Sequence, residues 1–192
     1  IKADELFFRY SSILSTKLQG SGIKSRSKKV IVENSIIATL DGVDSRLIDM
    51  ANYGELIVRD SILQQGNNSS NSQLIAYGLE KKVKQEFEIN KIVIKDNLIF
   101  FDRRQANVLV RSRLEDERIV SGNIFVGDFN DPSEFVEGNL WYLSREKARI
   151  APAPYIPEIH EKNVIMDRIR IIGDAQNDWR NKRILCREWI FR

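Results

Sequence analysis

The sequence predicts an all-β protein: a right-handed parallel β-helix (solenoid) with an irregular C-terminal segment. Two observations lead to this prediction. A short, strand-like apolar segment recurs along the chain with a polar turn residue behind it, and a second apolar segment recurs between the copies of the first. Both recur about every 25 residues, a period typical of solenoid proteins. Because one short segment cannot bury its own apolar face, successive copies must stack to form a core.

The first repeated segment is clearest at Val30–Ile37, and it recurs at Leu56–Leu63 and Ile92–Ile99, with a looser copy before and another after these three. The turn residues that mark the five copies are Ser11, Asn34, Asp60, Asp96 and Asn123. They are separated by 23, 26, 36 and 27 positions. Asparagine and aspartate tolerate the left-handed backbone of a sharp bend. We expect such side chains to hydrogen-bond along the stack.

The second segment lies between these turns. Its central residues are Ile23, Ile48, Ile75 and Leu109, at separations of 25, 27 and 34 positions. Both segments therefore lengthen in the same repeat, which places an insertion between Tyr77 and Lys91. Insertions in solenoids project from one face and often wall the binding groove. The sequence thus predicts that a groove lies beside residues 78–91.

An antiparallel sandwich is the alternative fold, with a strand about every ten residues. Its hairpins would favour two-residue turns of the Asn-Gly type. The turns here instead read Glu33-Asn34-Ser35 and Arg59-Asp60-Ser61, at matched positions of a larger period. This match favours the parallel β-helix.

The predicted domain organisation is a stack of β-helix coils over residues 1–148 and a C-terminal extension over 149–192. Three of the four prolines fall between Ala151 and Pro157, where regular structure is not expected. The last segment, Ile184–Phe191, is apolar, aromatic and basic. We expect it to cap the open end of the β-helix, whose strand edges would otherwise be unpaired. A subunit contact is the alternative, and the oligomeric state stays open.

Composition excludes several classes of site. The net charge of +3 over 192 residues is too small to predict a nucleic-acid partner. Cys186 and His160 are the only residues of their kinds, which excludes an internal disulfide and a zinc site built on several cysteines. No apolar run approaches the roughly 18 residues of a membrane span. We predict no metal-ligating side chains from these residues.

Three elements carry a resemblance to a known family. Gly20–Arg26 resembles the element Gly-His-x-Ile-Lys-Ser-Arg, Ser45–Asp49 resembles Ser-x-x-Ile-Asp, and Gln64–Glu80 resembles the coil that follows. In this order they are similar to bacterial right-handed β-helix proteins of the pectin-lyase-like group, largely uncharacterised, over approximately residues 5–130. The family histidine is Ser21 here, and the residues usual after the aspartate are also replaced.

The resemblance implies fold better than chemistry, because the group includes polysaccharide lyases, glycoside hydrolases, epimerases, phage tailspikes and non-catalytic coils. It implies a bacterial protein that is secreted, periplasmic or on the cell surface. Two functions follow. One is a carbohydrate-active protein that binds or cleaves an acidic polysaccharide, lyase-like if catalytic. The alternative is a non-catalytic surface or structural solenoid, such as an adhesin or a tailspike-like module.

Candidate site residues follow from the repeat alignment. Equivalent positions of adjacent coils stack about 4.8 Å apart. Lys24, Asp49 and Ala76 are then predicted to share one column, and Arg26 lies two residues further on. Since the flanking isoleucines should be core, Lys24 and Asp49 should point outward. The predicted catalytic residues are Lys24, Arg26 and Asp49.

The chemistry depends on the reaction. β-Elimination from a uronic acid needs a base near the sugar C5 and a cation or Ca²⁺ against the carboxylate, for which Lys24 or Arg26 would serve with Asp49 as partner. Hydrolysis needs two carboxylates about 5–9.5 Å apart. Predicted substrate-binding residues are Asp44, Arg46, Tyr77 and Glu80, with Tyr77 either stacking on a sugar ring or simply exposed. The alternative is an ion pair on a solvated face, which contributes little.

Overall fold

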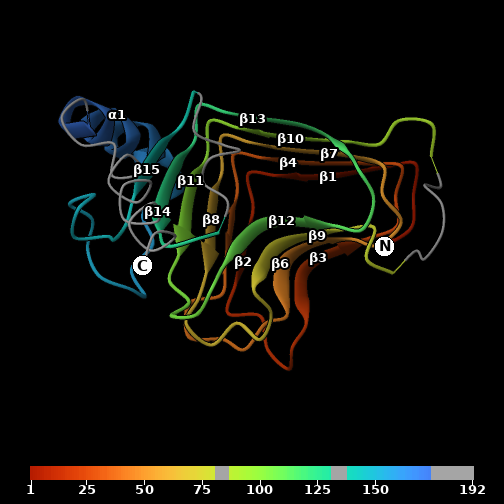
Figure 1. Cartoon of the computed structure of the whole chain (residues 1–192), viewed down its shortest axis with the longest axis horizontal. Coiled ribbons are helices and arrows are strands. Elements are labelled where there is room, and N and C mark those ends of the chain that lie inside the picture. Colours follow the sequence, from red (N-terminus) through yellow and green to blue (C-terminus); the bar gives the residue numbers. More distant parts are fainter. Residues whose placement is uncertain (81–86, 131–137, 174–192) are drawn as a thin grey trace, which may run out of the picture.

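The computed structural model describes residues 1–80, 87–130 and 138–173, and its strands form three all-parallel sheets (Figure 1). Sheet A runs in the order β1 (Glu5–Arg9), β4 (Lys29–Glu33), β7 (Glu55–Arg59), β10 (Lys91–Lys95) and β13 (Glu117–Ser121). Sheet B runs β15 (Leu140–Tyr142), β14 (Ile124–Gly127), β11 (Leu98–Phe101), β8 (Ile62–Gln65), β5 (Ile36–Ala38) and β2 (Ser12–Leu14). Sheet C runs β12 (Val108–Ser112), β9 (Gln73–Tyr77), β6 (Arg46–Met50) and β3 (Ser21–Ser25).

From β1 to β14 the chain visits sheets A, B and C in turn, so each of these strands pairs with the strand three positions earlier or later. The last strand, β15, instead pairs with β14 in sheet B. In Figure 1, sheets A and C lie on opposite sides of the core, and sheet B closes one end between them. The prediction of an all-β, parallel fold is therefore confirmed. Among the described strands the pairs are parallel, which rules out a sandwich of antiparallel hairpins.

The turn from sheet A to sheet B repeats a left-handed residue. Asn34, Asp60 and Asp96 have φ values of 46°, 51° and 55°, as the turn chemistry predicts. In the first and last copies this position is Tyr10 (φ 47°) and Gly122 (φ 70°). The turn residues assigned from the sequence there, Ser11 and Asn123, were one residue late.

A hydrogen-bonded ladder occupies the next position of each turn. The Oγ of Ser35 accepts from the backbone N–H of Ser11 at 3.2 Å. The Oγ of Ser61 accepts from Ser35 N–H at 3.2 Å, and Asn97 Oδ1 accepts from Ser61 N–H at 2.9 Å. Asn123 Oδ1 continues the ladder to Asn97 N–H at 3.0 Å. The expected hydrogen bonding along the stack is present. It lies one residue after the predicted turn residues Asn34, Asp60 and Asp96, whereas Ser11 and Asn123 take part in it themselves.

The core contains the isoleucines that the repeat predicted. Ile23, Ile48 and Ile75 are buried and stand in register on neighbouring strands of sheet C. In β12, however, the partner of Ile75 is Val110, so placing Leu109 at this position was wrong by one residue. The insertion precedes β12, and spacing alone cannot set the register across it, because a slip of one residue moves each side chain to the other face.

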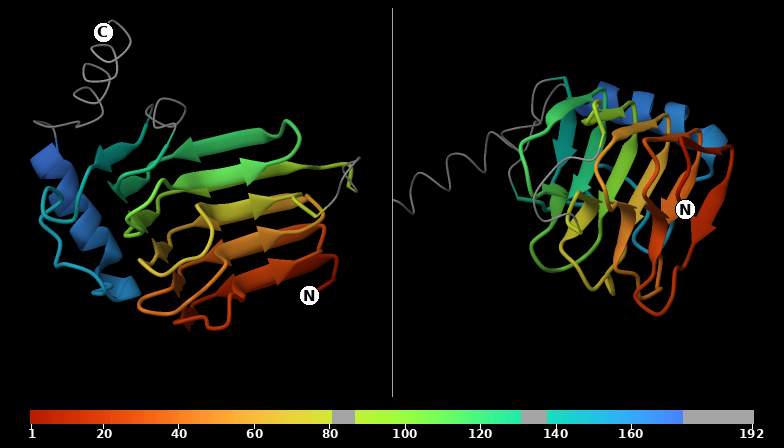
Figure 2. Two further views of the ribbon diagram at one scale, coloured as in Figure 1. Left: turned by 60° about the horizontal axis from the view of Figure 1, so that its bottom comes forward. Right: turned by 90° about the vertical axis from the view of Figure 1, so that its right-hand side faces the viewer.

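The outer face of sheet B is covered by the C-terminal extension. Leu98, Phe100 and Ile124 pack in a second apolar cluster with Met166 and Ile169 of helix α1 (Lys162–Gly173), which follows the short 3₁₀ helix η2 (Ile159–Glu161). Figure 2 shows α1 crossing the strands of this sheet. The described part of the extension thus lies against a sheet face. The predicted cap, residues 184–191, lies outside the described residues, so capping stays a prediction.

Candidate functional site

An ionic cluster lies on sheet C, where the repeat alignment predicted charged residues to meet. We use this name for Lys24 of β3, Arg46 and Asp49 of β6, Arg26 just after β3, and Glu80 just after β9. Lys24 stands in register with Asp49, and Asp49 with Ala76, so the predicted column is confirmed. The parallel pairing of β3, β6 and β9 brings together residues up to 56 positions apart.

The centre of the cluster is the carboxylate of Glu80. Lys24 Nζ donates a hydrogen bond to its Oε1, and Arg26 Nη2 donates to its Oε2 at 2.6 Å. The hydrogen bond from Lys24 is the main cause that lowers the pKa of Glu80. Glu80 is therefore a carboxylate at neutral pH, held by one cation on each oxygen at a partly exposed position.

Asp49 lies beneath this pair. It is 3% exposed, and burial raises the pKa of its carboxyl group although Arg46 and Lys24 oppose the shift. Its Oδ2 accepts from Arg46 Nη1 at 3.1 Å and lies 3.8 Å from Lys24 Nζ. A carboxyl group with a raised pKa is the usual form of a general base or acid. Asp49 is the cluster's candidate for that role.

Two polar atoms of the cluster are buried without a hydrogen-bond partner. They are Oδ1 of Asp49, which can only accept when ionised, and Nε of Arg46, which can only donate. A hydroxyl group or a water molecule can donate to the first and accept from the second. This pair of atoms is therefore suited to a hydroxylated ligand once the cover above Asp49 opens.

Arg111 extends the cluster and was missed from the sequence. It stands in register with Ala76, in the same column as Lys24 and Asp49, and it is exposed. Across three strand spacings it lies about 14 Å from Lys24 along the column. The one-residue error at Leu109 hid it, because the misplaced register moved Arg111 out of the column.

Two predicted substrate-binding residues lie elsewhere. Tyr77 is fully buried, its hydroxyl donates to the carbonyl of Gly54, and its ring centroid is 5.2 Å from that of Tyr53. Burial raises the pKa of Tyr77. Asp44 is also fully buried, in the turn between β5 and β6. Neither side chain can contact a substrate at the surface in this arrangement.

The pockets beside the insertion and beside helix α1 both lie outside the cluster. Residues 81–86 lie outside the described residues, so the predicted groove beside residues 78–91 stays a prediction. A cavity of about 570 Å³ adjoins the far end of the insertion, with Phe87 and Ile89 on one wall and Lys28, Lys29 and Glu55 on the other. It faces sheet A, whereas the ionic cluster is on sheet C.

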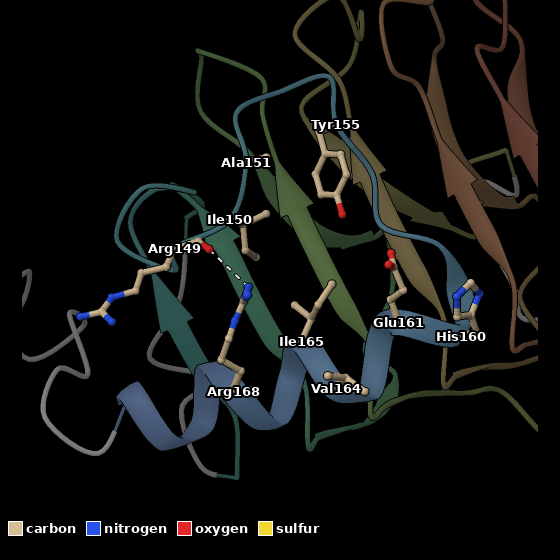
Figure 3. A pocket seen from close by; sticks show the side chains of 9 residues that line it. All are labelled: Arg149, Ile150, Ala151, Tyr155, His160, Glu161, Val164, Ile165 and Arg168. Atoms are coloured by element: carbon tan, nitrogen blue, oxygen red, sulfur yellow. Dashed lines mark hydrogen bonds between the residues drawn. The ribbon is translucent and has the colours of Figure 1, made fainter.

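The second pocket, of about 490 Å³, lies between helix α1 and the segment before it (Figure 3). Ile150 and Ile165 line its apolar side, and Tyr155 points into it. His160, the only histidine, stands at its rim with Nδ1 3.3 Å from Glu158. A catalytic histidine is held in orientation by a further polar group, usually a buried one. The carboxylate of Glu158 is exposed, so it does not provide such a group for His160.

Metal and membrane features can be judged for the described residues only. There, no three or more His, Cys, Asp or Glu side chains form a group that could hold a metal ion. The ionic cluster is a poor Ca²⁺ site, since three cations accompany its two carboxylates. Within the same residues no helix has the length and apolarity to cross a membrane.

Comparison with known proteins adds no relative: no family model, no curated protein and no solved structure matches the chain. The function is therefore inferred from the geometry of the ionic cluster and from the resemblance seen in the sequence.

Proposed function

We propose that the chain is part of a right-handed parallel β-helix of the pectin-lyase-like kind, and that its ionic cluster binds an acidic polysaccharide. The regular passage of the chain through three parallel sheets supports the fold. One observation supports this function most directly: Lys24 and Arg26 each donate a hydrogen bond to one oxygen of the Glu80 carboxylate.

A uronate carboxylate presents the same two oxygens as Glu80. Exchange of one carboxylate for the other keeps both charge-assisted hydrogen bonds, which are the strong kind. Arg111 offers a further cation in the same column for a neighbouring sugar unit. The orphaned atoms of Asp49 and Arg46 would take a sugar hydroxyl beside the carboxylate. Cations, hydroxyl partners and an extended column together match a charged polymer of sugars.

Binding is proposed ahead of cleavage. In a lyase reaction Asp49 would remove the proton from C5, the electrons of that C–H bond would form a double bond between C4 and C5, and the bond from C4 to the leaving oxygen would break as that oxygen takes up a proton. Its carboxyl group is only 3% exposed beneath Lys24 and Arg46. A base must come within hydrogen-bond reach of the proton that it removes. Cleavage therefore needs more than the exchange with Glu80 that binding needs, because Asp49 must also come within reach of the C5 proton.

A non-catalytic structural solenoid is the second candidate, and one observation favours it. Each charged side chain of the cluster already has an internal partner, as the side chains of a solvated ionic face have. Both candidates are compatible with a secreted, periplasmic or surface location in a bacterium, where polysaccharides are met. The bacterial origin is inferred from the resemblance alone.

A panel of polymers tests the proposal. We expect affinity electrophoresis to retard the protein in gels containing polygalacturonate or alginate and not in gels containing dextran, which lacks carboxylates. Absorbance of the unsaturated product, followed in the same mixtures, tests cleavage. Retardation without product supports a binding protein, and product supports a lyase. Equal mobility in all gels, without product, would leave the structural candidate.

A further inference from the structure

A buried carboxylate without a counter-charge lies inside the turn that joins β5 to β6. Asp44 is 0% exposed, and among the described residues its carboxylate receives a single hydrogen bond, from Thr39 Oγ1 to Oδ2 at 2.8 Å. The other oxygen, Oδ1, is buried without a partner. Placing an ionised carboxylate in such surroundings is strongly unfavourable unless a positive charge accompanies it.

Further oxygen atoms gather around this carboxylate. The hydroxyl oxygen of Thr39 lies 3.4 Å from Ser69 Oγ and 3.3 Å from the backbone carbonyl oxygen of Gln64. Thr39 and Ser69 are themselves buried. Carboxylate, hydroxyl and carbonyl oxygens thus converge from two neighbouring turns of the chain. These are the ligand types that hard cations prefer.

A second buried oxygen without a hydrogen-bond partner, Oε1 of Gln65, lies on the neighbouring strand. Ala38 pairs with Gln64, so Thr39 and Gln65 follow them on adjacent rungs. Gln65 is fully buried, and its Nε2 donates to the carbonyl of Asn71 at 2.8 Å, which leaves Oε1 without a donor. An amide oxygen and an ionised carboxylate only accept hydrogen bonds, so neither satisfies the other. Both need an electropositive partner.

We propose that a hard cation, Na⁺ or Ca²⁺, binds between these two turns. Its ligands are the Asp44 carboxylate, the hydroxyl oxygens of Thr39 and Ser69, and Oε1 of Gln65. The ion neutralises the buried carboxylate and joins the turn before β6 to the turn before β9. These turns lead into the strands of sheet C, so the ion would stabilise the part of the fold that carries the ionic cluster. The proposal does not depend on polysaccharide binding.

Thermal unfolding tests the site. Protein treated with EDTA and dialysed into choline chloride is titrated with NaCl or CaCl₂ at constant ionic strength. We expect a saturable rise of Tm by roughly 5 °C or more with one of the two ions once its concentration is about 100-fold above Kd. Asp44→Asn should abolish the rise. Asp41→Asn, an exposed aspartate of the same turn, should keep it.

A second variant guards against misfolding of Asp44→Asn. Ser69→Ala removes one neutral ligand and should weaken ion binding several-fold in isothermal titration while retaining the saturable rise. Equal Tm values in choline, sodium and calcium chloride would overturn the proposal. A rise that persists unchanged in Asp44→Asn would also overturn it.

Discussion

Lys24 and Asp49 occupy the same position on neighbouring strands of sheet C, with Lys24 Nζ 3.8 Å from Asp49 Oδ2. They are 25 residues apart in the chain, one repeat of the fold. The lysine is exposed and also holds Glu80, whereas the aspartate is buried beneath it. Two neighbouring strands thus place an accessible cation beside a desolvated carboxyl group.

Replacing Asp49 with asparagine should stabilise the protein at neutral pH. Burial raises the pKa of Asp49, so its ionised form is disfavoured in the fold. The protonated carboxyl group of Asp49 stabilises the fold fully at a pH below 3.8, its pKa in the unfolded chain. This stabilisation is lost as pH rises through the higher pKa that Asp49 has in the folded protein. Asp49→Asn lacks this loss. Its Tm should match wild type near about pH 3 and exceed it by about 2–4 °C near pH 7.

Calorimetric melting of both proteins across this pH range measures the difference. A variant that is less stable than wild type at neutral pH would contradict the account. It would mean that the ionised Asp49 contributes more through Arg46 and Lys24 than burial costs.

Replacing Glu80 with glutamine should strengthen binding of an acidic polymer. The change removes the internal carboxylate that competes for Lys24 and Arg26. Exposed ion pairs contribute about 0.2–1 kcal/mol each, so we expect an affinity gain of about three- to tenfold. Isothermal titration with polygalacturonate measures it. Glu33→Gln is the matched control, because Glu33 also bridges two cations, Arg9 and Arg59, but on sheet A.

Unchanged or weaker binding by Glu80→Gln would count against the role of Glu80 as a stand-in for the ligand carboxylate. A similar gain in Glu33→Gln would show that net charge alone explains the effect.

The C-terminal extension should detach from sheet B when Arg145 is replaced. Its guanidinium forms two hydrogen bonds of 2.7 Å with Asp102 and donates to the carbonyls of Ala151 and Tyr155 at 3.0 and 2.9 Å. Removing one partner of a buried ion pair costs about 3–5 kcal/mol. Arg145→Ala should lose this much in urea unfolding, whereas Arg149→Ala, an exposed neighbour, should lose under about 0.5 kcal/mol. Equal losses in the two variants would refute this role for Arg145.

The hydrogen-bonded ladder beside the left-handed turns should make a measurable contribution to the free energy of unfolding. Asn97 is fully buried, accepts from Ser61 N–H, and donates to the carbonyl of Val58 at 2.9 Å. Asn97→Ala removes the acceptor of the Ser61 N–H and a donor to the Val58 carbonyl, and a buried polar group left without a partner costs about 1–3 kcal/mol. We expect urea unfolding to show a clear decrease in the free energy of unfolding. Lys95→Ala, on the exposed side of the same turn, should change stability little, and a loss below that of Lys95→Ala would contradict the ladder's role.

Much of this architecture could be predicted from the sequence because the repeat is regular before the insertion. The column of Lys24 and Asp49 follows from copies with matched spacing and no intervening loop. Leu98–Phe101 is apolar throughout, which is typical of a strand covered on both sides, and this pattern agrees with the burial of both faces of β11. The sequence does not say which segment provides that cover.

The errors at Leu109 and Arg111 have a common cause. Register beyond the insertion depends on hydrogen bonding and not on residue counts, so Leu109 was misplaced and Arg111 missed. The burial of Tyr77 also depends on a contact between neighbouring turns. Its ring lies inside because its hydroxyl reaches the carbonyl of Gly54, and no local sequence pattern records that contact. Contacts between coils are set by the three-dimensional stack.

The central claim is that Lys24 and Arg26 form a receptor for a ligand carboxylate. Its most direct test is isothermal titration of polygalacturonate into wild type, Lys24→Ala/Arg26→Ala and Arg9→Ala/Arg59→Ala. The last pair has the same charge change around Glu33 on sheet A. We predict that the first double variant loses binding by at least about tenfold, as expected for two charge-assisted hydrogen bonds, and that the second stays near wild type. Equal affinity in all three proteins, or equal losses in the two variants, would contradict it.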